Sequence, residues 1–534
     1  MAGLSLADSG LPTVKYRDAA SLPALNWQQD TDAVSAMPNA PRGGFLTLPL
    51  TEFPDNVRRI GPDTPHALTP VLQDLQLPLL ARETPAAAWI PLLAKRWAVD
   101  GKRVYFELHD NARWSDNVPV TAEDFAFSLG FILDPDTGAD WQKRVLTEQI
   151  SALEVFSDNR FAFVLRAPAD DIPDVIAGFR PFAAHVFRNR HQWPENFNWY
   201  PEPTTGPYYL AQISADNATL TFRRTTNWWA AQLPRNQHRF NASRVILRVP
   251  QGTEEASLFQ RGELDSVAIC SLCAAQLGYF EQAARFRHIR LINTANSNRE
   301  VHPSSLLVNG KSAVLSQFAV RQKLRESLGL DLIAQNSANL ALSQLVEGSS
   351  EPVLTNYDGG VLPDTLTLSY TDTADLPLLQ HIAVNAQENG LHLVLRQLSA
   401  DVLATKLALG QYDLVWLKFT SPLSAEGFLS LFRPDAGGLY ISNPGFPPYL
   451  LSEHDTNKAA TTLARELNRL ALLIPGIEAT RHSRAFWEWI RFPEETDMQS
   501  DPIAPFDPLT GGRFWIDRKE RAAILAQPER GNPS

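Results

Sequence analysis

The second half of the chain alternates apolar runs with helical patterns. Four apolar segments have the length of buried strands, at 305–309, 366–370, 391–395 and 412–416. Helical spacing of apolar residues fills 377–389, and Gly390 follows as the residue that ends this helix. Because strands and helices alternate here, we expect an α/β fold class with a parallel sheet and right-handed crossovers.

The first half carries shorter segments in which apolar and polar residues alternate, a pattern typical of half-buried strands. These segments lie at 45–48, 104–108, 152–165 and 220–224. We also expect an apolar helix around 72–81, a connector over 289–302 and a long amphipathic helix over 459–473.

The stretch from Asn111 to Phe125 predicts a strand end, a tight turn and a capped helix. Asp116-Asn117 is a turn dipeptide, and Asn tolerates left-handed backbone angles nearly as well as Gly. Thr121 is a good N-cap, and acidic residues follow it in the first turn. By itself this stretch is a fold signature and not an active site.

Size and charge exclude some classes of protein. A chain of 534 residues is too long for one simple core, so we expect two or three domains. The formal charge of −11 argues against general nucleic-acid binding, which needs a basic face. No run of 18 apolar residues is present, and the first 16 residues lack the pattern of a signal peptide. The composition therefore leaves two possibilities, a cytoplasmic protein or a secreted protein whose signal has been removed.

The two cysteines, Cys270 and Cys273, form a Cys-Ser-Leu-Cys motif. A structural zinc site needs four ligands and no second pair exists, so we expect a small local disulfide or two buried thiols. The sequence contains no nucleophile elbow, zinc-protease motif, phosphate loop or dinucleotide fingerprint. We therefore expect no enzyme activity, no catalytic residue, no metal site and no cofactor.

Several motifs resemble one protein family. The stretch at 112–125 resembles the "A-x-W-S-D-G-x-P-V-T-A-E-D-V" block of the family 5 extracellular solute-binding proteins, with Asn117 where the family usually has Gly. These proteins are the peptide-binding subunits of bacterial ABC importers. Residues 39–44 resemble the opening of the YejA-like branch of that family. Further motifs follow in family order, at 204–210, 227–234, 254–265, 318–324, 486–489 and 514–517.

The resemblance implies a two-lobed periplasmic-binding-protein fold of type II, cluster C, with mixed sheets and a hinge between the lobes. We expect lobe I to comprise residues 1–52, 205–300 and 476–534, with an inserted subdomain at 53–204. Residues 301–475 form the expected second lobe. Two crossings of the chain, near residues 300 and 475, would then form the hinge on which the lobes close.

The resemblance also implies a function without turnover. We expect a monomeric periplasmic protein, its signal peptide removed, that captures an oligopeptide or peptide-like solute in the cleft between its lobes. It would deliver this solute to an inner-membrane ABC permease. Two alternatives remain: a binding protein for a non-peptide ligand such as a sugar, opine or metal chelate, or a periplasmic peptidase.

In this family much of the ligand contact comes from the loop after the strand that ends here at Trp416. Relatives often have Trp-x-x-Asp there, and the Asp pairs with the ammonium of the peptide. Phe419 replaces that Asp, which puts ammonium binding at this position in doubt. Lys418 would pair with a ligand carboxylate, or it is a solvated lysine beside a core tryptophan. Thr420 and Ser421 complete the expected loop.

Other candidate ligand-binding residues rest on the same resemblance. In the first lobe, Glu52 and Phe53 follow the opening strand, and Glu52 is either a partner for a cation or a plain surface residue. Tyr440 and Asn443 match a segment near the ligand, although Asn443 would also suit a turn before Pro444. Trp489 belongs to the aromatic tail and is a candidate either for the core or for the site.

Overall fold

The structure, a computed structural model, describes most of the chain and divides it into two compact units. It describes residues 10–29, 36–62, 64, 68–82, 88–169, 171–251, 254–269, 280, 288–295, 303–335, 340–346, 360–372, 375–398, 400–419, 423, 425–433, 441–442, 456–479, 481–493 and 503–527. Unit 1 is Met1–Val267 with Phe486–Asp497 and Asp501–Ser534, and unit 2 is Ala268–Ala485 with Met498–Ser500. The three-part division expected from the sequence stays a prediction.

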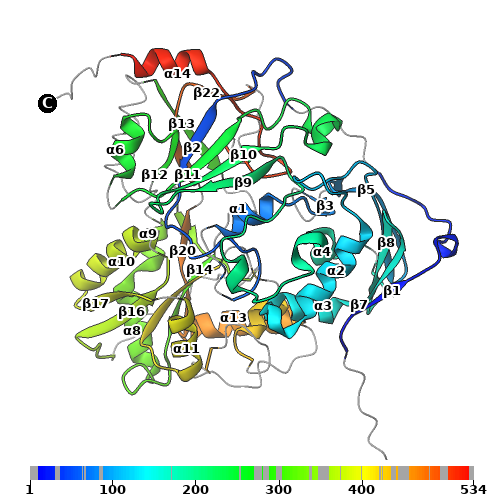
Figure 1. Cartoon of the computed structure of the whole chain (residues 1–534). Helices are drawn as coiled ribbons and strands as arrows, with labels where there is room; N and C mark the ends of the chain where they lie inside the picture. The colour runs from blue at the N-terminus through cyan, green and yellow to red at the C-terminus, as the bar shows by residue number, and fades with distance from the viewer. Residues whose placement is uncertain are drawn as a thin grey trace, which may run out of the picture. The chain divides into compact units, whose positions relative to one another are not determined.

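Unit 1 contains two main sheets (Figure 1). The first has the order β1 (Thr13–Tyr16), β7 (Ile150–Ser157), β8 (Arg160–Leu165), β6 (Arg103–Leu108) and β5 (Ala94–Asp100). The second has the order β2 (Phe45–Pro49), β11 (Arg244–Arg248), β10 (Thr219–Arg224) and β9 (Tyr208–Ile213). Short strands pair β3 (Leu80–Ala81) with β4 (Ile90–Pro91) and β22 (Ile490–Arg491) with β23 (Trp515–Ile516). Both main sheets carry the alternating segments that the sequence predicts.

The helices of unit 1 are mostly short. They are α1 (Thr69–Asp74), α2 (Ala122–Leu133), α3 (Asp140–Gln149), α4 (Asp174–Ala177), α5 (Ala184–Phe187), α6 (Glu255–Gln260) and α14 (Arg518–Leu525). The predicted start of α2 is confirmed: Asn117 has a φ of 72°, and Asp124 accepts the amide of Thr121 at 2.8 Å. The apolar helix expected around 72–81 is wrong in extent, because α1 ends before Pro78, which a helix interior does not tolerate.

Unit 2 is built on a five-stranded sheet of order β17 (His392–Gln397), β16 (Thr365–Tyr370), β18 (Leu414–Lys418), β14 (Ser304–Val308) and β19 (Leu473–Pro475). β16 runs parallel to both β17 and β18, which confirms the parallel strands expected from the sequence. β14 is antiparallel to β18 and β19. β16, β18 and β19 therefore end at the edge where β14 begins, and we call it the carboxyl edge of this sheet.

Helices cover both faces of the unit 2 sheet (Figure 1). They are α8 (Phe318–Leu328), α9 (Leu330–Gln335), α10 (Leu376–Glu388), α11 (Ala400–Leu409), α12 (Ala425–Ser430) and α13 (Thr456–Arg469). Alternate strand residues point to opposite faces. Accordingly Trp416 belongs to a core with α8 and α10, whereas Val415 and Leu417 belong to a core with α11, α12 and α13. The expected helix over 459–473 ends at Arg469, and Ala471 takes a left-handed φ of 51° before β19.

Two of the places where the chain passes between the units lie within strands. The first crossing, at Val267 and Ala268, lies in β12 (Ser266–Ile269), and the second, at Ala485 and Phe486, lies in β21 (Arg481–Trp487). β21 lies between β12 and β13 (Ile289–Ala295) in one three-stranded sheet. The connector expected over 289–302 thus contains a strand. A further pair, β15 (Leu340–Leu342) with β20 (Ile477–Ala479), stands just before the second crossing.

Candidate functional site

Lys418 is the last residue of β18, and its side chain lies at the carboxyl edge of the unit 2 sheet. Its Nζ donates to Asp375 Oδ1 at 2.8 Å and to Asp372 Oδ2 at 3.0 Å. Both acids come from the segment between β16 and α10, which reaches the same edge because β16 and β18 are parallel. The Lys418 side chain is 27% exposed, so it is neither fully solvated nor without partners.

The two acids around Lys418 differ in burial. The Asp375 side chain is 11% exposed and the Asp372 side chain 43%. Burial lowers the pKa of Lys418, but the two carboxylates outweigh this effect and raise it above its ordinary value. Burial also raises the pKa of Asp375, against the opposing effect of Lys418. The ammonium and its two acids therefore form a charged cluster with one negative charge in excess when all three are ionised.

Asp375 takes its position from α10. It stands at the N-cap of that helix, yet its carboxylate makes no capping hydrogen bond and turns to Lys418. The Trp416 indole Nε1 is buried without a hydrogen-bond partner among the described residues, and its proximity lowers the pKa of Asp375. The Trp416 indole and the N-terminus of α10 therefore both stabilise the ionised carboxylate of Asp375. The Asp372 side chain is the more accessible of the two acids.

A second polar group lies along the same edge. Ser304 is directly opposite Lys418 in the β14–β18 pair, and its amide donates to Ser343 Oγ at 2.7 Å. The Ser343 hydroxyl donates to Glu478 Oε2 at 2.9 Å. Burial raises the pKa of Glu478, which the Ser343 hydrogen bond partly opposes. Among the residues that the structure describes, the carboxyl edge therefore presents three acids, Asp372, Asp375 and Glu478, against one base, Lys418.

In unit 1, Glu52 and Phe53 follow the carboxyl end of β2, as the sequence led us to expect. Glu52 is exposed and makes no hydrogen bond or ion pair with any residue that the structure describes. Phe53 is half-buried and stacks on Trp199, with ring centroids 6.1 Å apart. Trp199 and its neighbour Tyr200 are 44% and 45% exposed. We call Phe53, Trp199 and Tyr200 the aromatic patch of unit 1.

The aromatic patch is fixed by hydrogen bonds between its two loops. The amide of Val57 donates to the Asn198 carbonyl at 2.7 Å, and Arg58 Nε donates to Asn198 Oδ1 at 2.8 Å. Arg59 adds a buried ion pair with Glu202, at 2.6 Å. Sequence reasoning missed Trp199 and Tyr200, because they lie about 145 residues from Phe53 and match no motif.

Trp489 is fully buried in unit 1. Its Nε1 donates to Asp265 Oδ1 at 2.7 Å, and its ring stacks on Trp487 at 4.6 Å. The same carboxylate accepts the amide of Thr47 at 2.6 Å and pairs with Arg521 at 3.3 Å. The indole is thus part of a buried network that joins four segments, around Thr47, Asp265, Trp489 and Arg521.

The remaining sequence candidates lie outside the described residues. These are Thr420, Ser421, Tyr440 and Asn443, together with Cys270 and Cys273. Phe419, the residue at the position of the family aspartate, is described and packs beside the core of Leu307 and Val415. Its amide donates to the Pro303 carbonyl at 2.9 Å.

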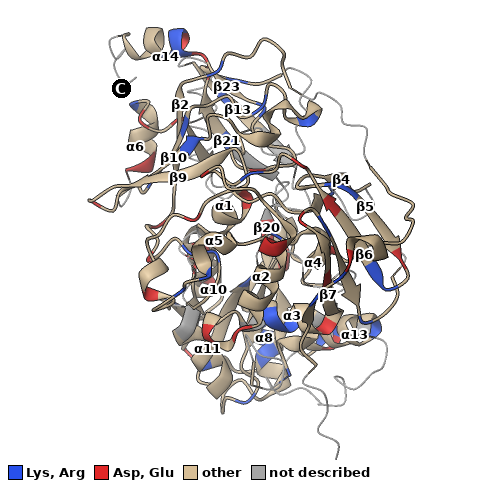
Figure 2. Ribbon diagram, turned by 45° about the vertical axis from the view of Figure 1, so that its right-hand side comes forward, with Lys and Arg blue, Asp and Glu red and all other residues tan. Residues whose placement is uncertain are grey.

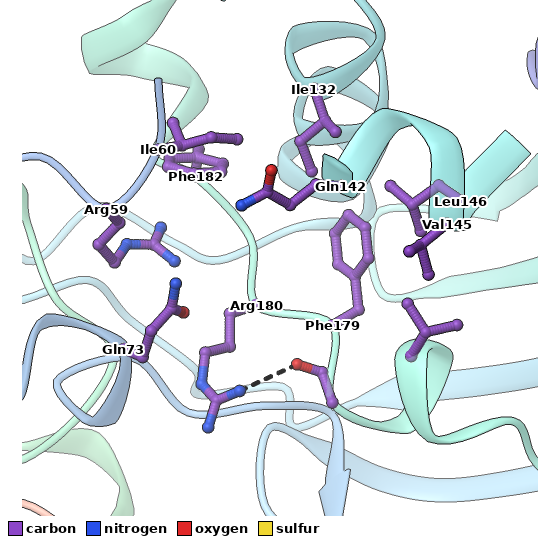
Figure 3. A pocket seen from close by; sticks show the side chains of 12 residues that line it. Arg59, Ile60, Gln73, Ile132, Gln142, Val145, Leu146, Phe179, Arg180 and Phe182 are labelled. Carbon is purple, nitrogen blue, oxygen red and sulfur yellow. Dashed lines mark hydrogen bonds between the residues drawn. The ribbon is translucent and has the colours of Figure 1, made fainter. Parts of the chain in front are cut away.

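A hollow of about 130 Å³ in unit 1 contains none of the sequence candidates (Figure 3). Its floor is apolar and includes Ile132, Leu146 and Phe179. Its two arginines are already engaged, Arg59 by Glu202 and Arg180 by the Gly178 carbonyl at 3.1 Å. This hollow therefore offers a ligand mainly apolar surface, because both of its arginines already have partners.

Two features are absent from the described ranges. No three His, Cys, Asp or Glu side chains gather there as ligands for a metal ion. Among the helices of these ranges, none has both the length and the apolar character needed to cross a membrane. Lys, Arg, Asp and Glu are scattered over the described ribbon (Figure 2).

The family profile and the relatives that match this chain all describe solute-binding or periplasmic binding proteins. The profile described as "Bacterial extracellular solute-binding proteins, family 5 Middle" matches residues 88–325. The chain is 27% identical over 298 residues to the "Nickel-binding periplasmic protein" of Escherichia coli K12, a match that covers 54% of this chain. It spans about half of that relative's length, 52%.

Solved structures share the fold over most of the chain. The ABC transporter substrate-binding protein CtaP from Listeria monocytogenes matches with a TM-score of 0.65 at 15% identity, covering 89% of this chain and 99% of that one. The periplasmic binding protein DppA from Helicobacter pylori, in complex with the peptide STSA, also gives 0.65, at 14% identity, with 90% and 99% covered. The fold class inferred from the sequence, a two-lobed α/β binding-protein fold, is thereby confirmed.

Proposed function

Because this chain belongs to the family 5 extracellular solute-binding proteins of bacteria, we propose that it is the solute-capturing subunit of an ABC importer. It works outside the cytoplasmic membrane and delivers its solute to the membrane permease without chemical turnover. Its solute is an oligopeptide or peptide-like molecule with a positively charged group. The YejA-like assignment within the family stays a prediction.

The charge of the carboxyl edge supports this choice of ligand. Sequence alone suggested that Lys418 pairs with a ligand carboxylate, because the family aspartate is replaced by Phe419. The Lys418 ammonium, however, already has two carboxylate partners, and a third would add repulsion from Asp372 and Asp375. We therefore propose that the ligand group at this edge is positively charged, and not the carboxylate that the sequence led us to expect. With Glu478 on the same edge, the excess of acid favours a ligand ammonium or guanidinium.

The exposed acid of the pair is the natural partner for such a ligand. Asp372 can turn to a ligand ammonium while Asp375 keeps Lys418 compensated, so no buried charge loses its partner. In unit 1, the aromatic patch supplies apolar surface, and the neighbouring Glu52 supplies an exposed carboxylate. Asp372 is the residue that carries the proposal.

Calorimetric titration with peptides tests the proposal. Asp372→Asn should weaken binding of a tetrapeptide with a free N-terminus about tenfold, or ~1.4 kcal/mol, the size of a charge-assisted hydrogen bond. The same peptide with an acetylated N-terminus should bind both proteins equally. Asp364→Asn is the matched control, because Asp364 is an exposed acid just before the other end of β16.

The alternatives give different results in the same experiment. Equal losses for the free and the acetylated peptide would contradict an ammonium site at Asp372. The nickel-binding relative favours a metal chelate as the second candidate, so Ni²⁺ is titrated alone and with a chelator. Tight binding of the chelate with no binding of peptide would replace our proposal. Steady cleavage of the peptide, followed by mass spectrometry, would indicate a peptidase.

A further inference from the structure

A second polar hollow lies in unit 2, close to the beginning of β18 and apart from Lys418, which ends that strand. Its volume is about 360 Å³. Its lining comes from the loop after β14, from strands β16 and β17, and from α11 with the turn that leads into β18. Its lining includes Lys311, Thr367, Ser369, Arg396, Lys406 and Asp413.

In the described part of the chain, three cations line this hollow against one carboxylate. Lys311 and Arg396 make no ion pair within the part of the chain that the structure describes, and Lys406 reaches only the Gln411 carbonyl, at 3.5 Å. Asp413, the one acid of the lining, accepts the amide of Thr367 at 3.1 Å. The hollow thus carries a local positive charge of about two on a chain whose net charge is −11. We call it the basic hollow.

A hydroxyl of a largely buried residue also lines the basic hollow. Ser369 is only 5% exposed, and its hydroxyl makes no hydrogen bond with any described residue. Ser369 and Thr367 alternate with Leu366, Leu368 and Tyr370, which pack into the core on the opposite face of β16. Arg396 is the register partner of Ser369 on β17, so both side chains leave the sheet on the same side.

The floor of the hollow is held rigid by Asn309. This side chain is 5% exposed, and its amide donates to the carbonyls of Gly410 at 3.0 Å and Tyr412 at 2.7 Å. Its Oδ1 accepts the amide of Lys311 at 3.1 Å. Asn309 thereby connects the loop that carries Lys311 to the turn that follows Lys406, so two of the cations belong to segments with fixed spacing.

We propose that the basic hollow is a binding site for a small multivalent oxyanion of the phosphate type. Lysine and arginine supply the charge, Arg396 adds a planar set of N–H donors, and Ser369 and Thr367 supply hydroxyl donors. Asp413 sets a limit, because its charge disfavours a ligand that fills the whole hollow. The site is independent of solute capture at the carboxyl edge and does not rest on the proposed function.

Titration calorimetry with pyrophosphate and with inorganic phosphate, at constant ionic strength, tests this site on the full chain. Wild-type protein should bind pyrophosphate more tightly than phosphate, because two phosphate groups meet more of the cations. Lys311→Gln and Arg396→Gln should each weaken pyrophosphate binding at least tenfold, and Ser369→Ala several-fold. Lys323→Gln is the matched control, since Lys323 lies on α8 of the same unit, pairs with Glu326 on the surface, and should change binding less than twofold.

Each outcome decides for or against the site. Equal pyrophosphate affinity in all four variants, with folds verified by circular dichroism, would overturn the proposal. The proposal would also be overturned if the binding heat disappeared in NaCl of the same ionic strength. Vesicles of phosphatidic acid and of phosphatidylcholine separate a free anion from a lipid headgroup. We expect neither to co-sediment with the protein, and vesicle binding without pyrophosphate binding would contradict a free-anion site.

Discussion

At Lys418 one ammonium is shared by two carboxylates that differ in exposure. Asp375 is the more buried partner of the lysine, with a side chain 11% exposed, and Asp372 is the more exposed one, at 43%. This difference between the two acids is what the proposed ligand contact requires. Neither acid follows from the sequence around Lys418, because they lie 43 and 46 residues away and match no motif.

A buried acid in unit 1 gives a prediction of pH dependence. Burial raises the pKa of Asp265 from 3.8 to about 6, although Arg521, Thr47 and Trp489 oppose the shift. A raised pKa means that the folded state keeps a proton that the unfolded state loses. The stabilising contribution is therefore complete below about pH 4 and is lost as the pH rises to about 6.

Urea unfolding of wild-type protein and Asp265→Asn between pH 4 and pH 7 measures this contribution. The unfolding free energy of the wild type, relative to the variant, should fall by about 2–3 kcal/mol as the pH rises. It should then stay level above about pH 6.5. A difference that does not change with pH would show that Asp265 is ionised throughout, held by its three donors.

At the scale of elements, sequence patterns predict the strands and helices of the unit 2 sheet well. β16, α10, β17 and β18 each bury one continuous apolar pattern, and Gly390 follows α10 with a φ of 85°. Prediction fails at α1, whose end is set by the nearby Pro78 and not by the apolar pattern. It also fails at β13, because that strand forms by pairing with β21, almost 200 residues later in the chain. The aromatic patch and the acids around Lys418 were missed for the same reason.

The turn between β19 and β20 gives a prediction at this scale. Gly476 approaches β14 so closely that a Cβ there would lie 2.8 Å from the backbone carbonyl of Ser304. Gly476→Ala should therefore lower the unfolding free energy by about 1–3 kcal/mol, the usual cost of overpacking.

Gly130→Ala is the control for this substitution. Gly130 lies in α2, and a Cβ added there would meet no other group within 4 Å, so the change should raise the unfolding free energy by up to about 1 kcal/mol. Chemical denaturation measures both variants. A Gly476→Ala protein as stable as the wild type would show that the β19–β20 turn moves away from β14 at little cost.

At the scale of the whole molecule, the two crossings within β12 and β21 suggest a hinge. Neighbouring strands that carry both crossings form a short connection about which two compact units can rotate. We predict that saturating ligand reduces the radius of gyration measured by small-angle scattering. An unchanged radius, in protein first stripped of ligand by mild denaturation and refolding, would contradict closure.

Our central claim is that the protein captures a positively charged peptide or peptide-like solute and releases it unaltered. Native mass spectrometry of the protein as purified, before and after addition of a defined peptide mixture, tests this claim most directly. We predict one added mass per chain, which dissociates as an intact molecule with a free amino or guanidinium group. A retained sugar or metal chelate, peptide fragments that accumulate with time, or a mass that no peptide changes would contradict it.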